Sequence, residues 1–185
     1  LRRHLDLPEP SRAAARSSPP LWMNEYLLGV VSELSGGTAG LRDALGHYEA
    51  VLRQRPRSFW ANYRAAAVAF AVADDAERRS GASSAVRRGF AAAAERLGVC
   101  VGQRPENPAL RRQYARCLSK ADRLQEAVEQ CDKALALAPE HPETYATRMY
   151  LRLRLGQSHH FQKDRDRYDI LTGGDSGATA PVLDL

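Results

Sequence analysis

The chain has 185 residues, 44% of them hydrophobic, which is enough for one folded domain with a core. No apolar run approaches the ~20 residues of a membrane-spanning helix, so the composition argues against a membrane segment. The net charge is +5 and the isoelectric point is about 9.4. This mild excess of arginine is more typical of solvated helix faces than of a nucleic-acid-binding surface.

Three cysteines, Cys100, Cys117 and Cys131, lack the paired spacing of disulfide frameworks and metal sites. Each falls within a helical pattern, where a free cysteine behaves as a small hydrophobic residue. An odd number without such a framework favours a reducing compartment, so we expect a cytoplasmic location. The chain begins without methionine or the apolar core of a signal peptide, so we also expect it to lie within a longer protein.

The N-terminal residues 1–21 mix proline, arginine, alanine and serine without apolar periodicity, and we interpret them as a mobile linker. Helical periodicity starts at Trp22 and continues to Leu34, where residues 35–38, Ser-Gly-Gly-Thr, end it. A second helix follows from Leu41 to Leu52 and stops before Pro56.

The next pair of helices is longer. Ser58 is placed to cap a helix that starts at Phe59 and continues to about Arg79. After a break at residues 80–84, another helix runs from Ala85 to just before Pro105. The additional residues at 72–88 predict either lengthened helices or a longer surface loop, and we favour a surface insertion over an arm that contacts a partner.

The stretch from Arg104 to Pro139 has the clearest pattern. Asn107 can cap a helix, and Pro108 fits its first position. Apolar residues then recur at helical spacing, first Leu110, Tyr114, Ala115 and Leu118, and after a polar break Leu124, Ala127, Val128, Cys131, Ala134, Leu135 and Ala138. Two amphipathic helices joined by a tight turn predict an antiparallel hairpin.

This hairpin resembles one tetratricopeptide repeat, whose unit is ~34 residues of helix-turn-helix. The small residues of the family fall on Ala115, Ala127 and Ala134, and its closing proline on Pro139, one period after Pro105. Arg111 departs from the family, which prefers tryptophan or leucine there, and so does Asp122, where the family often has glycine. The resemblance implies an all-α solenoid of antiparallel hairpins with about eight helices.

The residues after Pro139 predict one more helical hairpin. His141-Pro142 begins another helix, and the charged run from His159 to Leu171 fits a terminal helix that covers the last repeat. The solenoid would then span residues 22–171, in units 25–58, 59–107 with the insertion, 108–141 and 142–171 with the capping helix. Residues 172–185 read as a disordered tail.

The sequence has no motif of catalysis, phosphate binding or metal ligation. The adjacent His159 and His160 point to different helix faces, unlike metal ligands spaced four residues apart. His47 and a cysteine would form a nucleophile pair only if the fold joined them. We therefore expect no enzymatic activity, metal or cofactor in this segment.

The resemblance implies that the first helices of successive repeats line a concave groove for extended peptides. The groove-facing positions correspond to Trp60, Tyr63, Arg64, Arg112, Gln113, Arg116, Lys120, Tyr150 and Arg154. Arg112, Arg116 and Lys120 share one helical stripe on spacing alone. Such a groove favours an acidic segment or one with a free C-terminal carboxylate. The alternative is that the stripe is merely the solvated side of an amphipathic helix.

Tyr63 and Ala67 stand where chaperone-binding members of the family have lysine and asparagine, so a chaperone C-terminus is not an expected ligand. The main hypothesis is a noncatalytic protein-interaction module. A second is that the chain is the regulatory or substrate-recruiting tail of a bacterial serine/threonine kinase, whose associated repeats it resembles at residues 58–63 and 97–105. Nucleic-acid binding ranks last, because acidic residues from Glu126 to Glu143 interrupt any basic surface.

Overall fold

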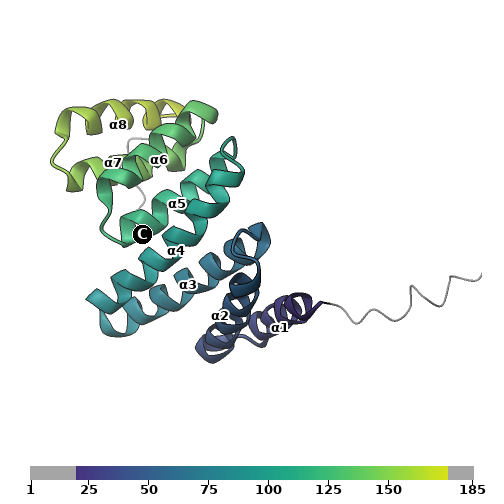
Figure 1. Ribbon diagram of the computed structural model, residues 1–185. Helices are drawn as coiled ribbons and strands as arrows, with labels where there is room; N and C mark the ends of the chain where they lie inside the picture. Colours follow the sequence, from purple (N-terminus) through teal and green to yellow (C-terminus); the bar gives the residue numbers. More distant parts are fainter. Residues whose placement is uncertain (1–19, 175–185) are drawn as a thin grey trace, which may run out of the picture.

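The computed structural model describes residues 20–174, and within that range the chain forms helices and turns without a strand. The helices are α1 (Leu21–Ser35), α2 (Gly37–Gln54), α3 (Phe59–Ser80), α4 (Ser84–Gln103), α5 (Pro108–Lys120), α6 (Leu124–Leu137), α7 (Pro142–Arg154) and α8 (Ser158–Thr172). Each packs mainly on its neighbours in the chain, and Figure 1 shows the pairs stacked from α1–α2 at one end to α7–α8 at the other. The predicted all-α solenoid of helical hairpins is confirmed.

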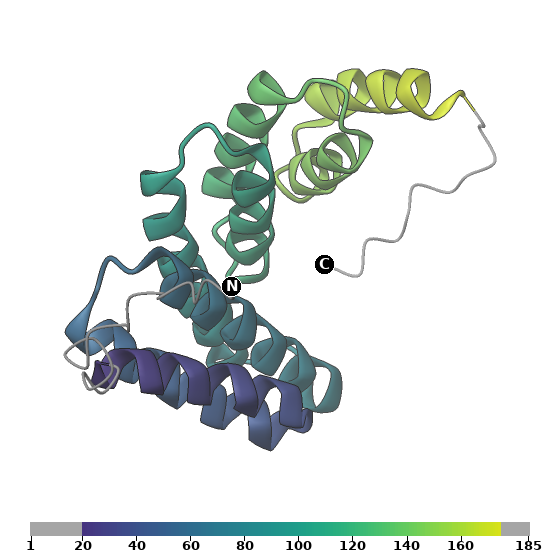
Figure 2. The same ribbon diagram turned by 90° about the vertical axis from the view of Figure 1, so that its right-hand side faces the viewer.

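In Figure 2, α1 and α2 lie at the lower end of the stack and α8 at its upper end, with the other helices between them. The linker predicted at residues 1–21 and the tail predicted at 172–185 lie outside the described residues except at their inner ends. There Leu21 begins α1 and Thr172 ends α8.

Local signals explain where several helices begin. Asn107 caps α5, because its side-chain oxygen accepts a hydrogen bond from the backbone N–H of Leu110 at 3.1 Å. Ser83 caps α4 in the same way through Val86, at 3.2 Å. Ser58 does precede α3, but its side chain forms no capping hydrogen bond. There the Asn62 side-chain amide donates instead to the Ser58 carbonyl at 2.9 Å.

The turn between α5 and α6 explains one departure from the repeat pattern. Asp122 has a φ of +65°, in the left-handed region that side chains with a Cβ rarely adopt. The corresponding turn between α7 and α8 has a glycine, Gly156, at a φ of +70°. The turn geometry is therefore what makes glycine the preferred residue at the position of Asp122.

The additional residues at 72–88 form no long surface loop. They lie instead in the last turns of α3 and the first turns of α4, so that these helices have 22 and 20 residues. Only residues 81–83 connect them. The alanine-rich faces of both helices are buried against each other along this extension, where Ala73 and Phe90 are in one core cluster. This burial favours helix over loop.

Small side chains form the contacts between adjacent helices. Ala115 and Ala127 are fully buried and Ala134 is 1% exposed, which agrees with the close-packing positions predicted from the sequence. Larger side chains fill the spaces between helices; the largest buried ones are Tyr48, Phe90, Leu118 and Leu151. The result is a core that continues along the stack from α2 to α7.

The three cysteines belong to this core, one each on α4, α5 and α6. Burial raises the pKa of the Cys100 thiol to about 11, and those of Cys117 and Cys131 to about 12. These side chains are therefore neutral packing residues near neutral pH.

The two ends of the stack differ in their outer surfaces. α1 is apolar on nearly all sides, and Leu27, Val31 and Leu34 on its outer face are 54%, 59% and 81% exposed. The outer face of α8 is largely polar and charged, although Ile170 is also exposed.

α8 is attached to α7 by a buried ion cluster. Asp164, only 3% exposed, accepts hydrogen bonds from Arg148 at 2.5 and 2.9 Å and from Arg152 at 2.6 Å. Burial acts to lower the pKa of Arg148, but the hydrogen bonds and charge of Asp164, together with Asp132, outweigh it and raise this pKa. Asp164 is the only buried residue of α8, so this cluster is central to the contact between the two helices.

Candidate functional site

Three of the residues predicted to line a groove lie together between α3 and α5. Tyr63, Gln113 and Arg116 line a cavity of about 240 Å³, which we call the α3–α5 cavity. The Gln113 side-chain amide donates to the Tyr63 hydroxyl at 3.4 Å, so the two helices are joined across the opening. The other lining residues are Ala66, Ala67, Phe70, Leu97 and Cys117.

The cavity combines aromatic walls with a positive charge at its rim. The guanidinium carbon of Arg116 lies 4.7 Å from the centre of the Phe70 ring, and the side chain is exposed. Tyr63 stacks nearly parallel to Phe59, which fixes its ring on the α3 side. A guanidinium can stack on an aromatic face and can also form bidentate hydrogen bonds with a carboxylate, so this arrangement suits an acidic ligand.

Three other predicted cations are neutralised by carboxylates from neighbouring helices. Arg64 pairs with Glu33 of α1 at 2.7 Å, Lys120 with Glu77 of α3 at 2.7 Å, and Arg154 with Asp122 of the α5–α6 turn at 2.8 Å. The Lys120 side chain is also mostly covered, at 13% exposed, and its amine lies 5.6 Å from the centre of the Phe90 ring. The stripe predicted on α5 is therefore divided, with Lys120 tied to α3.

The two remaining residues of α5 and α7 are Arg112 and Tyr150. Arg112 is half-buried, and its side chain forms no ion pair with any carboxylate in residues 20–174. Tyr150, on α7, packs against the main core cluster, and the Arg154 guanidinium lies 5.9 Å from its ring centre. Neither residue lines the α3–α5 cavity, so Arg112 extends the charge of the site without forming its wall.

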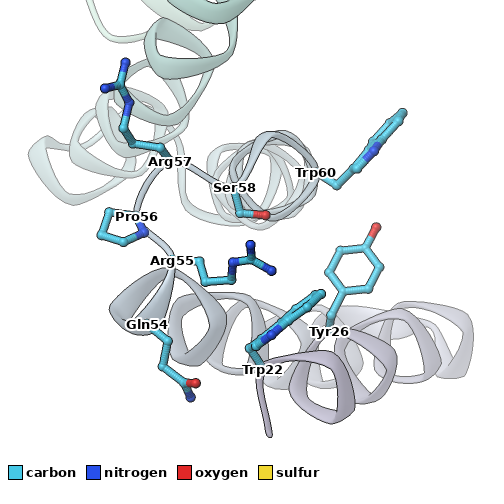
Figure 3. A pocket seen from close by; sticks show the side chains of 8 residues that line it. All are labelled: Trp22, Tyr26, Gln54, Arg55, Pro56, Arg57, Ser58 and Trp60. Atoms are coloured by element: carbon cyan, nitrogen blue, oxygen red, sulfur yellow. The ribbon is translucent and has the colours of Figure 1, made fainter. Parts of the chain in front are cut away.

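Trp60, the remaining predicted groove residue, lies elsewhere. It lines a separate and larger cavity at the start of α3, with Trp22 and Tyr26 of α1 and the turn before α3 (Figure 3). The side chain is 56% exposed. Of the nine residues that the sequence pattern groups, three therefore line the α3–α5 cavity, one lines this second cavity, and five line neither. The pattern also omitted Phe70, which spacing alone assigns to the helix but not to its open side.

Other combinations considered from the sequence are not brought together. His47 contacts Glu25 at 2.8 Å, whereas the Cys100 thiol faces the Phe59 carbonyl at 3.6 Å. Within residues 20–174 no group of three or more histidine, cysteine or acidic side chains is placed to hold a metal ion. None of the helices described is both long enough and apolar enough to cross a bilayer.

One part of the chain matches a known protein family. Residues 90–157, from α4 to the turn after α7, match the tetratricopeptide repeat family. The rest of the chain lies outside that match. No curated protein sequence matches the chain.

Solved structures named MamA share the fold over most of the chain. "MamA RS-1 ArsTM double mutant" has a TM-score of 0.67 at 18% identity, covering 88% of this chain and 82% of its own. "MamA MSR-1 C2" has a TM-score of 0.67 at 15% identity, with 87% and 80% covered. MamA 41-end from Desulfovibrio magneticus RS-1 has a TM-score of 0.62 at 17% identity, with 85% and 78% covered. At these identities the likeness concerns the fold, and none of it supports the kinase-tail alternative.

Proposed function

We propose that this chain is a noncatalytic protein-interaction module that binds a partner segment in the α3–α5 cavity. The observation that supports this proposal is the placement of Arg116 over Phe70 at the rim of a cavity walled by Tyr63. The helical-repeat fold supports it as well, since stacked hairpins present extended concave surfaces to partners.

The chemistry of the cavity favours an acidic segment or one with a free C-terminal carboxylate. Arg116 and the nearby Arg112 supply positive charge, and none of the residues that line the cavity is acidic. A carboxylate can accept two parallel hydrogen bonds from a guanidinium, which gives both affinity and orientation. The apolar floor formed by Ala66 and Leu97 suits an aliphatic side chain next to that carboxylate.

The proposed site includes fewer cations than the sequence predicted, because of the ion pairs. Arg64, Lys120 and Arg154 each already have a carboxylate, so a ligand would have to displace Glu33, Glu77 or Asp122 to use them. We assign the main contribution to Arg116 because its guanidinium lies over Phe70 and lines the cavity, with Arg112 in support. The same pairs interrupt a continuous basic surface, which makes nucleic acid a poorer fit.

The proposal is tested with fluorescent acidic peptides, each made with a free and with an amidated C-terminus. Arg116→Glu should weaken binding by about tenfold or more, since a hydrogen bond between charged groups contributes about 1.5–3 kcal/mol. Arg42→Glu is the matched control, because this exposed arginine on α2 undergoes the same change of charge away from the cavity. Equal affinities of the two variants, at unchanged melting temperature, would contradict the proposal.

A further inference from the structure

A second and larger cavity lies at the start of α3. It has a volume of about 770 Å³, and we call it the Trp60 pocket. It is lined by Trp22, Tyr26, Gln54, Arg55, Pro56, Arg57, Ser58 and Trp60. Both tryptophans of the chain are among these residues. The pocket shares no lining residue with the α3–α5 cavity, so it is a separate site on the molecule.

Three aromatic side chains from two helices form its walls. Figure 3 shows Trp22 and Tyr26 rising from α1 and Trp60 extending from α3, with the turn at residues 54–58 closing one end. Trp60 is supported from behind, since its ring meets Phe59 edge-on at 5.2 Å and Tyr63 edge-on at 6.3 Å. The exposed indole is therefore held in place by its neighbours although half of its surface faces solvent.

The charge of the pocket is positive. The Arg55 guanidinium lies 4.4 Å from the centre of the Trp22 ring and points into the opening in Figure 3, whereas Arg57 points away. None of the lining residues is acidic, and within residues 20–174 no carboxylate pairs with either arginine. A guanidinium stacked on an indole has its planar face covered, and its N–H edge remains available to an anion.

From these features we propose that the Trp60 pocket binds an extended peptide segment in which a proline ring stands beside a carboxylate. Aromatic grooves bind proline-rich segments because the preformed polyproline II helix loses little entropy and its rings stack on aromatic faces. The carboxylate would pair with Arg55 at its free edge. The volume of about 770 Å³ accommodates several residues and not a single side chain.

Single-stranded nucleic acid is the competing ligand for a surface of aromatic rings and arginines. Such binding also requires a row of cations along the phosphate backbone. Arg104, which does not line the pocket, lies 3.9 Å from the centre of the Phe59 ring and 5.7 Å from that of the Trp60 ring, so it is held against these aromatic side chains. The pocket thus directs one arginine inward, which matches a single carboxylate better than a chain of phosphates.

The test uses the intrinsic fluorescence of the full chain, since both tryptophans line the pocket. The probes are an eight-residue peptide of alternating proline and glutamate, one with glutamine for glutamate, and one with alanine for proline. Because residues 8–10 of the chain read Pro-Glu-Pro, the same pattern as the probe, the titration is repeated with Glu9→Gln, which removes that carboxylate from the chain. We expect the first peptide to change the emission and to bind about tenfold or more tightly than either of the others.

Single-residue variants test which side chains bind the peptide. Trp60→Ala should abolish binding, and its circular dichroism checks that the fold is intact. Arg55→Gln should bind the glutamate and glutamine peptides equally, which a merely structural role would not produce. Arg53→Gln, an exposed arginine on α2 outside the pocket, should bind like the original chain. Arg116→Glu should also leave binding unchanged, which separates this site from the α3–α5 cavity.

Three outcomes would overturn the proposal. The first is equal binding of the glutamate and alanine-substituted peptides, and the second is no change in emission with any peptide in the Glu9→Gln chain. The third is an oligo(dT) strand that binds more tightly than the peptide and loses its affinity in Arg55→Gln, which would assign the pocket to single-stranded nucleic acid.

Discussion

The ion cluster between α7 and α8 offers the most direct test of the packing described here. Asp164→Ala leaves the guanidinium groups of Arg148 and Arg152, 14% and 12% exposed, without their main partner. Removing one member of a buried ion pair costs about 3–5 kcal/mol. Asp132 still contacts Arg148 at 2.5 Å from an exposed position, so we expect the lower end, about 3 kcal/mol.

This loss should appear as local opening of α8. In a stack of repeats each element contacts mainly its neighbours, and α8 packs mainly on α7. A cost of about 3 kcal/mol raises the population of the opened helix by about a hundredfold. Hydrogen exchange measured by mass spectrometry should therefore show faster exchange throughout α8, with little change in α3 and α4.

Asp166→Ala is the matched control, because Asp166 is an exposed carboxylate on the same helix. Its only hydrogen-bond donor within residues 20–174 is Gln162, at 2.8 Å. This variant should change the exchange of α8 by less than about 1 kcal/mol. If Asp164→Ala and Asp166→Ala showed the same protection in α8, the ion cluster would not be what attaches the terminal helix.

Three further predictions concern stability. Gly29→Ala should lower the free energy of unfolding by about 1–3 kcal/mol, because a Cβ there would lie 2.7 Å from the Tyr48 ring. Gly46→Ala should raise the free energy of unfolding by about 0.5–1 kcal/mol, because Gly46 lies inside α2 with open space around it. Urea denaturation compares the two variants. Asp122→Gly should be more stable than Asp122→Ala by about 1 kcal/mol, because both lose the ion pair with Arg154 but only alanine keeps a Cβ at a φ of +65°. Stability should also fall as the pH rises above the ordinary thiol pKa of 9.0, because the unfolded thiols ionise while the buried ones, with raised pKa, stay protonated up to about pH 11. The expected slope is about 1.4 kcal/mol per thiol for each pH unit, and a variant with alanine at one cysteine should show a shallower slope between pH 9 and 10.5.

The repeat architecture could be predicted because it depends on local chemistry. Helical spacing, the Asn107 cap and the alanines at 115, 127 and 134 all act within one hairpin, and a hairpin of this kind can bury its apolar sides only by stacking on another. The extra length at residues 72–88 was visible as a broken period. Whether these residues form helix or loop could not be predicted, because that choice is decided by burial against the partner helix.

The candidate site could be predicted only in part. Periodicity shows that Arg116 and Lys120 share a face of α5, but Glu77, which neutralises Lys120, comes from α3 and is 43 positions earlier. Pairings of this kind depend on the angle between helices, which no spacing within one helix reveals. The Trp60 pocket could not be predicted for the same reason, since Trp22 and Trp60 belong to different pairs and line one pocket only because the fold brings the first turns of α1 and α3 to it.

The length of α3 sets a distance between the two proposed sites. Trp60 stands in its first turn and Phe70 almost three turns later, which corresponds to about 15 Å along the helix. A partner that filled both sites would need about five extended residues to bridge them. For a shorter ligand the sites would act independently, whereas a partner of sufficient length would bind the second site at a high effective concentration once the first is occupied. Because α3 is one continuous helix, it would fix the distance between the two sites and so favour partners whose two acidic elements have the matching spacing.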